Sequence, residues 1–545
     1  MWPTVNSSHN SSHTVSIHTL DDDSLLHIFY LYRPVVVFRG KKYDGDDEEE
    51  EEEDRNYGRT RIPEQWWYKL ARVCQRWRKI LLGSASYLDL CLVCTYGTPV
   101  ADMLEHSPPL PLVIDFFRAH WDITTEDEEG IILAFERRDR VRRVRLLITP
   151  QNLHNLFVAF FEEYPVLESL IMTLDVPVEH DTAIVLPELQ TPHLRHLMLR
   201  RFVLPIESRL LATAVGLVTL SLYLRVGFGH FNPDTLFQIL QSISFMPQLE
   251  TLIFVLTCRS SMGLHSMLLG HTSSMTQRAT LSNLRRLVFE GVKECIEAVV
   301  CHIAAPLLET LDVHVFDQLM LSEFSPHVPG LFQFVKTTDN LKFDCAKFKF
   351  LKDGVRMDLY PRREAKTHSF SIYVHNNYRR QVYLMADLLN TSIGSGEMFS
   401  TVEHLVLEDR VHRSTTDRYS DDRIKWRKFF QPFLNAKTLH VDDGIAKEFF
   451  RTLPPESADD GELTLDLPPM PEELSLLDHR PLPTLDLYRP LPMLEVFANL
   501  LPSLEELTYC GWLGSDDTAF TTFIDDGRQN ASRLVTMFRS GQVGA

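Results

Sequence analysis

A few residues have types and spacings that could carry chemistry, but none completes a catalytic or metal-binding set. Cys91 and Cys94 form a lone CxxC, whereas a zinc site needs four ligands and no second pair follows nearby. Alternation along a strand would place the two thiols on opposite faces. We interpret His193 and His196 in the same way, as side chains on opposite faces of a strand. These residues favour structural positions over metal ligands.

Motifs of nucleotide-binding and hydrolytic enzymes are missing from the sequence. Residues 392–396 (SIGSG) lack the first glycine of the G-x-S-x-G elbow. Neither a G-x-x-x-x-G-K-[ST] nor a G-x-G-x-x-G motif occurs. We therefore expect a protein that is not an enzyme and holds no cofactor or metal. A pocket in which several ionisable groups with shifted pKa values converge would instead favour an enzyme of unrecognised type.

Charge is concentrated in two segments. The chain has 55 basic and 74 acidic residues, and its net charge is −19. Residues 44–54 (DGDDEEEEEED) are almost entirely acidic, and the strongly basic stretch spans residues 137–145. We interpret the basic stretch as a charged surface; a phosphate, an acidic partner or the acidic run itself are the alternatives. An acidic chain repels the phosphate backbone, so we expect no nucleic-acid partner.

The sequence also bears on location. It contains no run of about 18 apolar residues and no secretory leader pattern, so we expect no membrane association. The 8 cysteines are scattered over the chain and do not form a disulfide framework. We expect a cytoplasmic and/or nuclear protein.

Two amphipathic helices are predicted near the N-terminus, within residues 15–84. Asp21 is the expected N-cap of the first, Leu20 and Leu25 form a hydrophobic staple, and Pro34 ends it. The second begins after Pro63 and continues to Gly83. Residues 1–14 are expected to be a disordered tail, and residues 40–62, which include the acidic run, a disordered loop between the helices.

Residues 85–545 repeat one short pattern. Five copies of Pro-x-Leu-charged-x-Leu begin at Pro165, Pro192, Pro247, Pro306 and Pro502, and three looser copies begin at Leu217, Leu284 and Val402. In each copy the residue two positions after the second apolar residue is also apolar, which is typical of a strand. Segments before Pro165 and Pro247 have helical periodicity. The repeating unit is therefore predicted to be a helix, a turn and a strand.

The spacing of the copies is uneven. From Leu167 to Leu308 the steps between their first leucines range from 23 to 35 residues, against about 20 to 29 in leucine-rich repeats. The asparagine that commonly comes after the strand in such repeats is missing. We therefore predict an α/β fold: a helical module followed by an irregular leucine-rich-repeat-like solenoid that binds a partner.

The N-terminal helices resemble the F-box. Residues 20–29 (LDDDSLLHIF) and 73–78 (VCQRWR) carry the resemblance to L-P-x-[DE]-[LIV]-L-x-x-I-F and V-C-x-x-W. Asp21 replaces the usual proline, and an insertion of about twenty residues separates the halves; a flexible loop of that length costs little closure entropy. Residues 87–90 (YLDL), 98–100 (TPV), 109–112 (PLPL) and 136–141 (ERRDRV) are similar to segments located after the F-box in fungal F-box proteins.

The resemblance covers the first third of the chain, and the remainder only through its repeats. It implies docking to a Skp-type adaptor and through it to a cullin–RING ubiquitin ligase, while the repeats recruit an unknown protein substrate. The implied adaptor-binding residues are Leu20, Leu25, Leu26, Ile28, Phe29, Leu70, Val73, Cys74 and Trp77.

Two interpretations of the helical pair stay open. In the first, the pair has more apolar side chains than the contact between its two helices can bury, and a groove on a partner protein covers the remaining ones. In the other interpretation they pack on the first repeat. The chain would then be a non-catalytic repeat scaffold for protein–protein interaction, independent of ubiquitin ligation.

Overall fold

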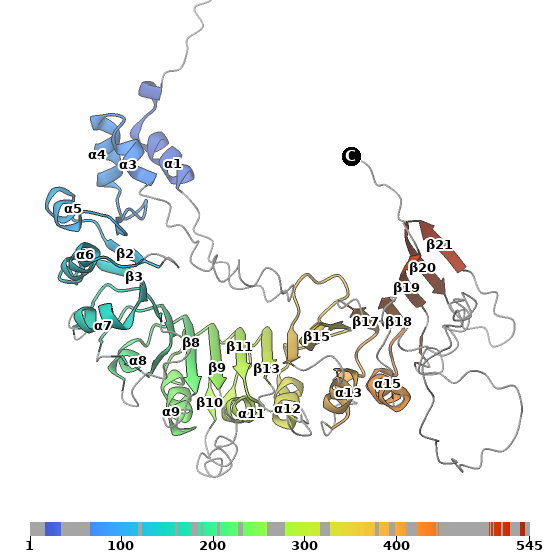
Figure 1. Ribbon diagram of the computed structural model, residues 1–545. Helices are drawn as coiled ribbons and strands as arrows, with labels where there is room; N and C mark the ends of the chain where they lie inside the picture. Colours follow the sequence, from blue (N-terminus) through green and yellow to red (C-terminus); the bar gives the residue numbers. More distant parts are fainter. Residues whose placement is uncertain are drawn as a thin grey trace, which may run out of the picture. The chain divides into compact units, whose positions relative to one another are not determined.

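The structure is a computed structural model, and it shows a mixed α/β protein (Figure 1). It describes residues 17–33, 66–117, 122–157, 162–175, 184–186, 189–203, 208–226, 233–258, 278–316, 328–375, 381–391, 398–409, 422–442, 445, 501, 503–504, 506–513, 516–523 and 535–539. These residues form twelve α-helices and a large, mostly parallel sheet that does not close into a barrel. None of the described helices is long and apolar enough to cross a membrane. The expected tail (1–14), the acidic loop (40–62) and the SIGSG segment (392–396) lie outside the described residues.

The chain divides into two units, Met1–Val215 and Gly216–Ala545. The division predicted near residue 84 stays a prediction. The helices of the first unit are α1 (Asp22–Tyr32), α3 (Trp66–Ala71), α4 (Gln75–Gly83), α5 (Val100–His106), α6 (Thr125–Phe135), α7 (Pro150–Phe157) and α8 (Arg209–Thr213), preceded by a 3-10 turn, Ile17–Thr19. Its main strands are β1 (Leu92–Cys94), β2 (Leu112–Phe116), β3 (Val141–Ile148), β4 (Ser169–Leu174) and β6 (His196–Arg200), all parallel and paired in that order. The short strands β5 (Ile184–Val185) and β7 (Phe202–Val203) form a separate pair.

The first predicted helix is confirmed with its N-cap. Asp21 has extended backbone angles, and its carboxylate accepts a 2.6 Å hydrogen bond from the Ser24 N–H at the start of α1. This bond is the main cause that lowers the pKa of Asp21. The helix ends at Tyr32, shortly before Pro34.

The single second helix predicted up to Gly83 is wrong, because the structure divides it into α3 and α4. Cys74 adopts an extended backbone (φ −160°, ψ 168°), and its sulfur accepts a 3.5 Å hydrogen bond from the Trp77 N–H. Cys74 is therefore the N-cap of α4, which ends at Gly83 as predicted. Apolar periodicity continues through Val73 and Cys74, so it could not reveal this break.

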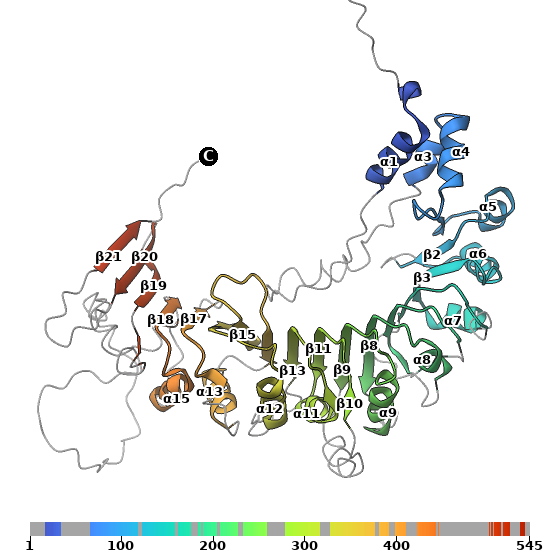
Figure 2. The same ribbon diagram turned by 180° about the vertical axis from the view of Figure 1, so that it is seen from behind.

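The second unit has helices α9 (Pro233–Ile243), α11 (Lys293–His302), α12 (Pro329–Thr337), α13 (Gln381–Thr391) and α15 (Asp422–Phe430). Its main strands are β8 (Thr219–Val226), β9 (Thr251–Cys258), β11 (Arg286–Gly291), β13 (Thr310–Val315), β14 (Cys345–Phe350), β15 (Gly354–Tyr360), β16 (Phe370–His375), β17 (His404–Asp409), β18 (Thr438–Asp442), β19 (Glu506–Leu513), β20 (Asp516–Phe523) and β21 (Val535–Arg539). The short strands β10 (Ala279–Thr280) and β12 (Ile303–Ala304) form a separate pair. The five helices follow the same side of the strands (Figures 1 and 2).

Every copy of the repeat forms a strand, as predicted. In all eight copies the strand begins two residues after the first apolar residue; Leu249 precedes β9 and Leu284 precedes β11 in this way. The second leucines align across neighbouring strands, with Leu252 of β9 opposite Leu287 of β11 and Leu287 opposite Leu311 of β13. These three side chains are fully buried. The repeated leucines therefore form the apolar ladder of the core.

An asparagine ladder lies before the strands rather than after them. Asn283, Asn340 and Asn435 each stand directly before the first apolar residue of a strand-forming segment. Their amide nitrogens donate to backbone carbonyls 34 to 36 residues earlier, Asn283 to Pro247 at 2.6 Å and Asn340 to Pro306 at 3.1 Å. These bonds give carbonyls of the preceding turns a hydrogen-bond donor and so link one turn to the next.

The strand order is not that of a simple repeat. After β13 the chain passes through α12 to β14, then returns through β15 to β16, which pairs in parallel with β13. The spatial order is β13, β16, β15, β14, β17, and β14 is parallel to β17. Gly354 at the start of β15 allows this close packing, since a Cβ there would lie 2.5 Å from the Val374 carbonyl oxygen. A reversed three-stranded meander therefore interrupts the parallel sheet.

Candidate functional site

The predicted adaptor-binding residues divide by burial. Leu25 and Phe29 are buried, and the Phe29 ring packs edge to face on Trp77 with centroids 5.0 Å apart. Ile28 is 42% exposed and Val73 is 56% exposed. The half-buried ones are Leu20, Leu26, Leu70, Cys74 and Trp77. Leu25 and Phe29 therefore hold the helices together, whereas Ile28 and Val73 are accessible to a partner.

Exposed apolar side chains extend further along α1 than the sequence analysis expected. Leu31 is 70% exposed and Tyr32 is 57% exposed, and with Ile28 they stand at helical spacings of three and four on one side of the helix. We call Ile28, Leu31 and Tyr32 the α1 face. The Tyr32 ring also lies against Trp66 of α3, with centroids 6.3 Å apart. Leu31 and Tyr32 continue the apolar stripe that begins at Leu25, and this continuation is the sequence signal that could have identified them as exposed apolar residues.

An arginine joins the two N-terminal segments, residues 20–29 and 73–78. Arg76 of α4 donates to the Leu20 carbonyl at 2.7 Å and to the Asp22 carboxylate at 2.6 and 2.8 Å. Because Leu20 and Asp22 flank the N-cap of α1, this contact sets the position of α4 against the start of α1.

The helical module is also tied to the sheet of its own unit. Trp67 of α3 is buried, and its indole N–H donates to the Cys91 carbonyl at 3.1 Å. Asp89 has a left-handed backbone (φ 53°), and its carboxylate pairs with Arg142 and Arg143 of β3. Part of the module's apolar surface therefore packs internally.

The basic stretch at residues 137–145 is largely paired within its unit. Arg145 lies 3.2 Å from the carboxylate of Asp115, and Arg140 donates to the Leu110 carbonyl at 3.0 Å. Arg138 pairs with Glu162 at 2.7 Å. These contacts favour the interpretation as a structural charged surface over a ligand site.

The thiols and histidines considered for chemistry have structural surroundings. Burial raises the pKa of Cys91 to about 11 and that of Cys94 to about 12, so both remain protonated at neutral pH. His196 opens β6, but His193 lies in the preceding turn, so their predicted place in one strand is wrong. The turn closes at Leu194, whose N–H donates to the Thr191 carbonyl, and the strand begins only afterwards. Within the described ranges, no group of three or more His, Cys, Asp or Glu side chains could hold a metal ion.

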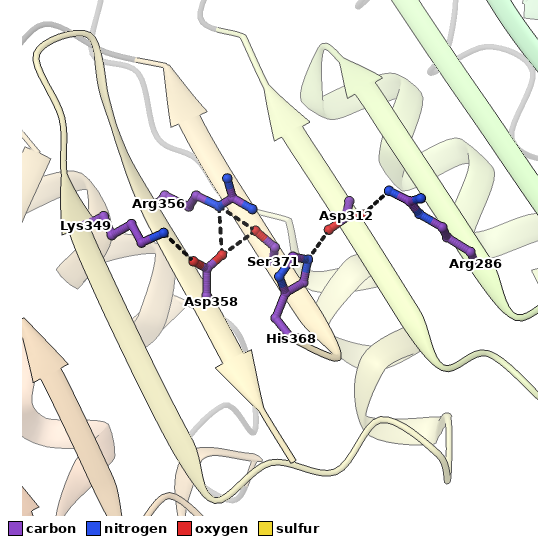
Figure 3. Close-up of polar contacts among 7 residues, drawn as sticks. All are labelled: Arg286, Asp312, Lys349, Arg356, Asp358, His368 and Ser371. Atoms are coloured by element: carbon purple, nitrogen blue, oxygen red, sulfur yellow. Dashed lines mark hydrogen bonds and ion pairs between the residues drawn. The ribbon is translucent and has the colours of Figure 1, made fainter. Parts of the chain in front are cut away.

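Buried charges gather on the meander of the second unit (Figure 3). Asp358 of β15 is 1% exposed, and its Oδ1 accepts hydrogen bonds from Arg356 Nε at 2.8 Å and from Ser371 Oγ at 2.7 Å. Lys349 Nζ lies 3.5 Å from its other oxygen. Burial acts to raise the pKa of Asp358, but the charges of Arg356 and Lys349 outweigh it and lower this pKa. The carboxylate is therefore ionised at neutral pH.

A second buried carboxylate joins the meander to the parallel strands beside it. Asp312 of β13 pairs with His368, which stands just before β16, and lies 3.3 Å from Arg286 of β11. Burial acts to raise the pKa of Asp312, and the hydrogen bond and charge of His368 outweigh it and lower this pKa. Neither buried carboxylate was predicted from the sequence; for Asp358 the signal is the alternation of charged and apolar residues at 355–359 (VRMDL).

Comparison with known proteins adds no identification: no protein-family model matches the sequence, and a search of curated proteins finds no match. The function is therefore inferred from the residues and their geometry.

Proposed function

We propose that the chain is a substrate-receptor subunit of a Skp–cullin–F-box type ubiquitin ligase. The N-terminal helices would dock a Skp-type adaptor, and an irregular leucine-rich-repeat-like solenoid would recruit the substrate. Such a subunit breaks and forms no bond, because it acts by raising the effective concentration of the substrate beside the conjugating enzyme.

The exposed α1 face is the observation that carries the proposal. Three large apolar side chains on one side of α1 and the exposed Val73 lie within or directly beside the two segments that resemble the F-box. Burying such residues on a partner is favourable by about 25 cal/mol per Å² of apolar surface. Arg76 supports the proposal because it holds both segments together in one module.

Binding to a Skp-type adaptor tests this proposal. The full chain carrying Ile28→Asp and Leu31→Asp should keep its melting temperature, because both side chains are exposed, and should lose adaptor binding in a pull-down. Val166→Asp, at a position of the same unit that is 38% exposed, is the matched control and should bind like the unaltered chain. If the unaltered, folded chain does not bind the adaptor, the proposal fails.

The alternative is a repeat scaffold in which the helical module covers the end of the sheet. The Trp67 contact with Cys91 favours this alternative, because it packs the helical module on the chain that leads into the sheet. Adaptor binding distinguishes the two functions: a substrate receptor binds the adaptor and loses that binding with Ile28→Asp/Leu31→Asp, whereas a scaffold does not bind it with or without these substitutions. Trp67→Ala should lower stability under either function, because Trp67 is buried.

A further inference from the structure

The meander of the second unit carries a local excess of positive charge. Residues 339–368 contain eight basic and five acidic residues, in a chain with 55 basic and 74 acidic residues. Burial and pairing remove charges of both signs: Asp358 and Arg356 are buried, Lys349 and Lys347 pair with Asp358 and Glu408, and Asp353 lies 3.7 Å from His375. The exposed charged residues that remain are five cations, Lys342, Lys352, Arg362, Arg363 and Lys366, and two acids, Asp339 and Glu364. The sign of the surface charge is therefore reversed here relative to the whole chain.

Four exposed cations of this segment lie at one end of the meander. Arg362, Arg363 and Lys366 stand in the loop between β15 and β16, and all three are exposed. Lys342 is exposed just before β14. The strand ends bring it beside the loop, since the Asp344 N–H donates to the Tyr360 carbonyl at 3.0 Å. We call these four residues the basic patch.

The loop that carries the patch is fixed at its base. A turn closes within it through the hydrogen bond from the Ala365 N–H to the Arg362 carbonyl at 3.0 Å, and the Ser369 N–H donates to the Leu359 carbonyl at 2.8 Å. His368 anchors the end of the loop to Asp312 of β13 (Figure 3). Ordering these cations before binding lowers the entropy cost of holding a ligand.

The charge of the patch also reaches the neighbouring parallel strands. Burial is the main cause that lowers the pKa of His440 on β18; Asp442 and Glu408 act to raise this pKa, and Lys347 and then Arg363 add to the lowering. Exposed charges act over about 8–10 Å at physiological ionic strength. A ligand at the patch therefore meets its four cations together with the exposed carboxylate of Glu364 in the same loop.

We propose that the basic patch, Lys342, Arg362, Arg363 and Lys366, binds an acidic segment of a partner protein. This inference rests on the proposed function, because it assigns a substrate class to the substrate receptor: proteins that present an extended run rich in Asp and Glu. The reversed meander supports this location, since insertions into repeat folds often form the binding face.

Charge and side-chain type favour an acidic peptide over single-stranded RNA. Proteins that bind single strands combine cations with exposed aromatic rings on which bases stack. The patch consists of Lys and Arg, and its nearest aromatic residue along the loop, Tyr360, is half-buried with its ring edge to face on His368. A peptide carboxylate can bind to Lys and Arg side chains alone, without an aromatic ring to stack on.

The test uses the purified full chain without adaptor and a fluorescein-labelled peptide of alternating Glu and Ser, with binding measured by fluorescence anisotropy. The unaltered chain should bind this peptide, and added salt should weaken the binding. Arg362→Glu/Arg363→Glu should weaken it roughly tenfold or more, since both attractions become repulsions.

Arg427→Glu/Lys428→Glu in α15 is the matched control. It reverses an adjacent pair of exposed cations in the same unit, with the same change in net charge. This control should alter peptide affinity by less than about twofold, because Arg427 and Lys428 lie in the last turn of α15 and not among the loop and strand-end residues that form the patch. Equal weakening by the two double variants, or no binding by the unaltered chain, would overturn the inference.

Two further measurements separate this inference from its rivals. An oligouridine RNA that binds the patch more tightly than the acidic peptide would overturn it. The Arg362→Glu/Arg363→Glu variant should keep adaptor binding, and Ile28→Asp/Leu31→Asp should keep peptide binding. Failure of adaptor binding in the unaltered chain with intact peptide binding would refute only the ligase role.

Discussion

Replacing Asp358 by asparagine tests whether the buried charges of the meander stabilise the second unit. Asp358 is 1% exposed and Arg356 is 4% exposed, so the guanidinium that remains after Asp358→Asn stays in a poorly solvated site. Lys349 is 14% exposed and can turn its ammonium toward water. The charge that loses the carboxylate of Asp358 is therefore mainly that of Arg356, which keeps its hydrogen bond to Ser371 at 3.1 Å and the charge of Asp312 nearby.

The magnitude follows from this burial. Removing one partner of a buried ion pair costs about 3–5 kcal/mol. For a unit of this size, that lowers the melting temperature by roughly 10 °C. The Ser371 hydroxyl still has an amide oxygen to donate to, so the loss of charge is the main change.

Urea unfolding at several pH values provides the assay. The folded-state pKa of Asp358 is lowered, so its stabilisation is fully present above the unfolded value of about 4 and is lost as the pH falls through the folded value. The difference between Asp358→Asn and the unaltered chain should thus be complete at pH 7 and shrink below about pH 4. Asp339→Asn, at an exposed position, is the control and should change stability by less than about 0.5 kcal/mol.

A difference below about 1 kcal/mol at neutral pH would refute this reasoning, because it would mean that the carboxylate is already protonated or that Arg356 is hydrated. A second refutation would be a difference that does not change between neutral and acid pH.

Further predictions concern the leucine ladder, the asparagine ladder and the N-terminal module. Leu252→Ala should cost about 2–5 kcal/mol in urea unfolding because Leu252 is fully buried, whereas Leu307→Ala, at a position 40% exposed, should cost under about 1 kcal/mol. Asn340→Ala should lower the free energy of unfolding by about 1 kcal/mol through loss of its bond to the neighbouring turn, and no loss would contradict the ladder. Arg76→Ala should separate α4 from the start of α1 and weaken adaptor binding several-fold, while Asp22→Asn, which keeps an oxygen acceptor for Arg76, should weaken it less. Adaptor pull-down with both variants measures this, and equal binding by Arg76→Ala and the unaltered chain would contradict it.

Local patterns predicted the strands well. The Leu-x-x-Leu-x-Leu spacing locates the strand of each of the eight repeat copies, because alternation along an extended backbone is a property of neighbouring residues. Asp21 was identified as an N-cap for the same reason, since its bond to Ser24 spans three residues. Similar logic failed at Cys74, where the apolar spacing is equally compatible with one continuous helix or two.

The candidate site could be predicted only in part. Ile28 and Val73 were identified as partner-binding positions from their motif, and both are exposed, whereas Leu25 and Phe29 of the same motif are buried. Whether an apolar residue faces a partner or an internal seam depends on the groups that pack against it, which a motif does not contain. Adaptor binding at these residues stays a prediction.

The sequence by itself determined the N-cap at Asp21, the positions of the repeat strands and the apolar residues that point into the core, because these depend on contacts a few residues apart. Only the tertiary structure decided the reversed order of β14, β15 and β16, since strand order depends on pairings between residues far apart in the chain. It also decided that the charges at Arg356 and Asp358 are buried rather than solvated. An alternating polar strand looks the same in sequence whether its polar face meets water or another set of charges, and here the neighbouring strands supply those charges.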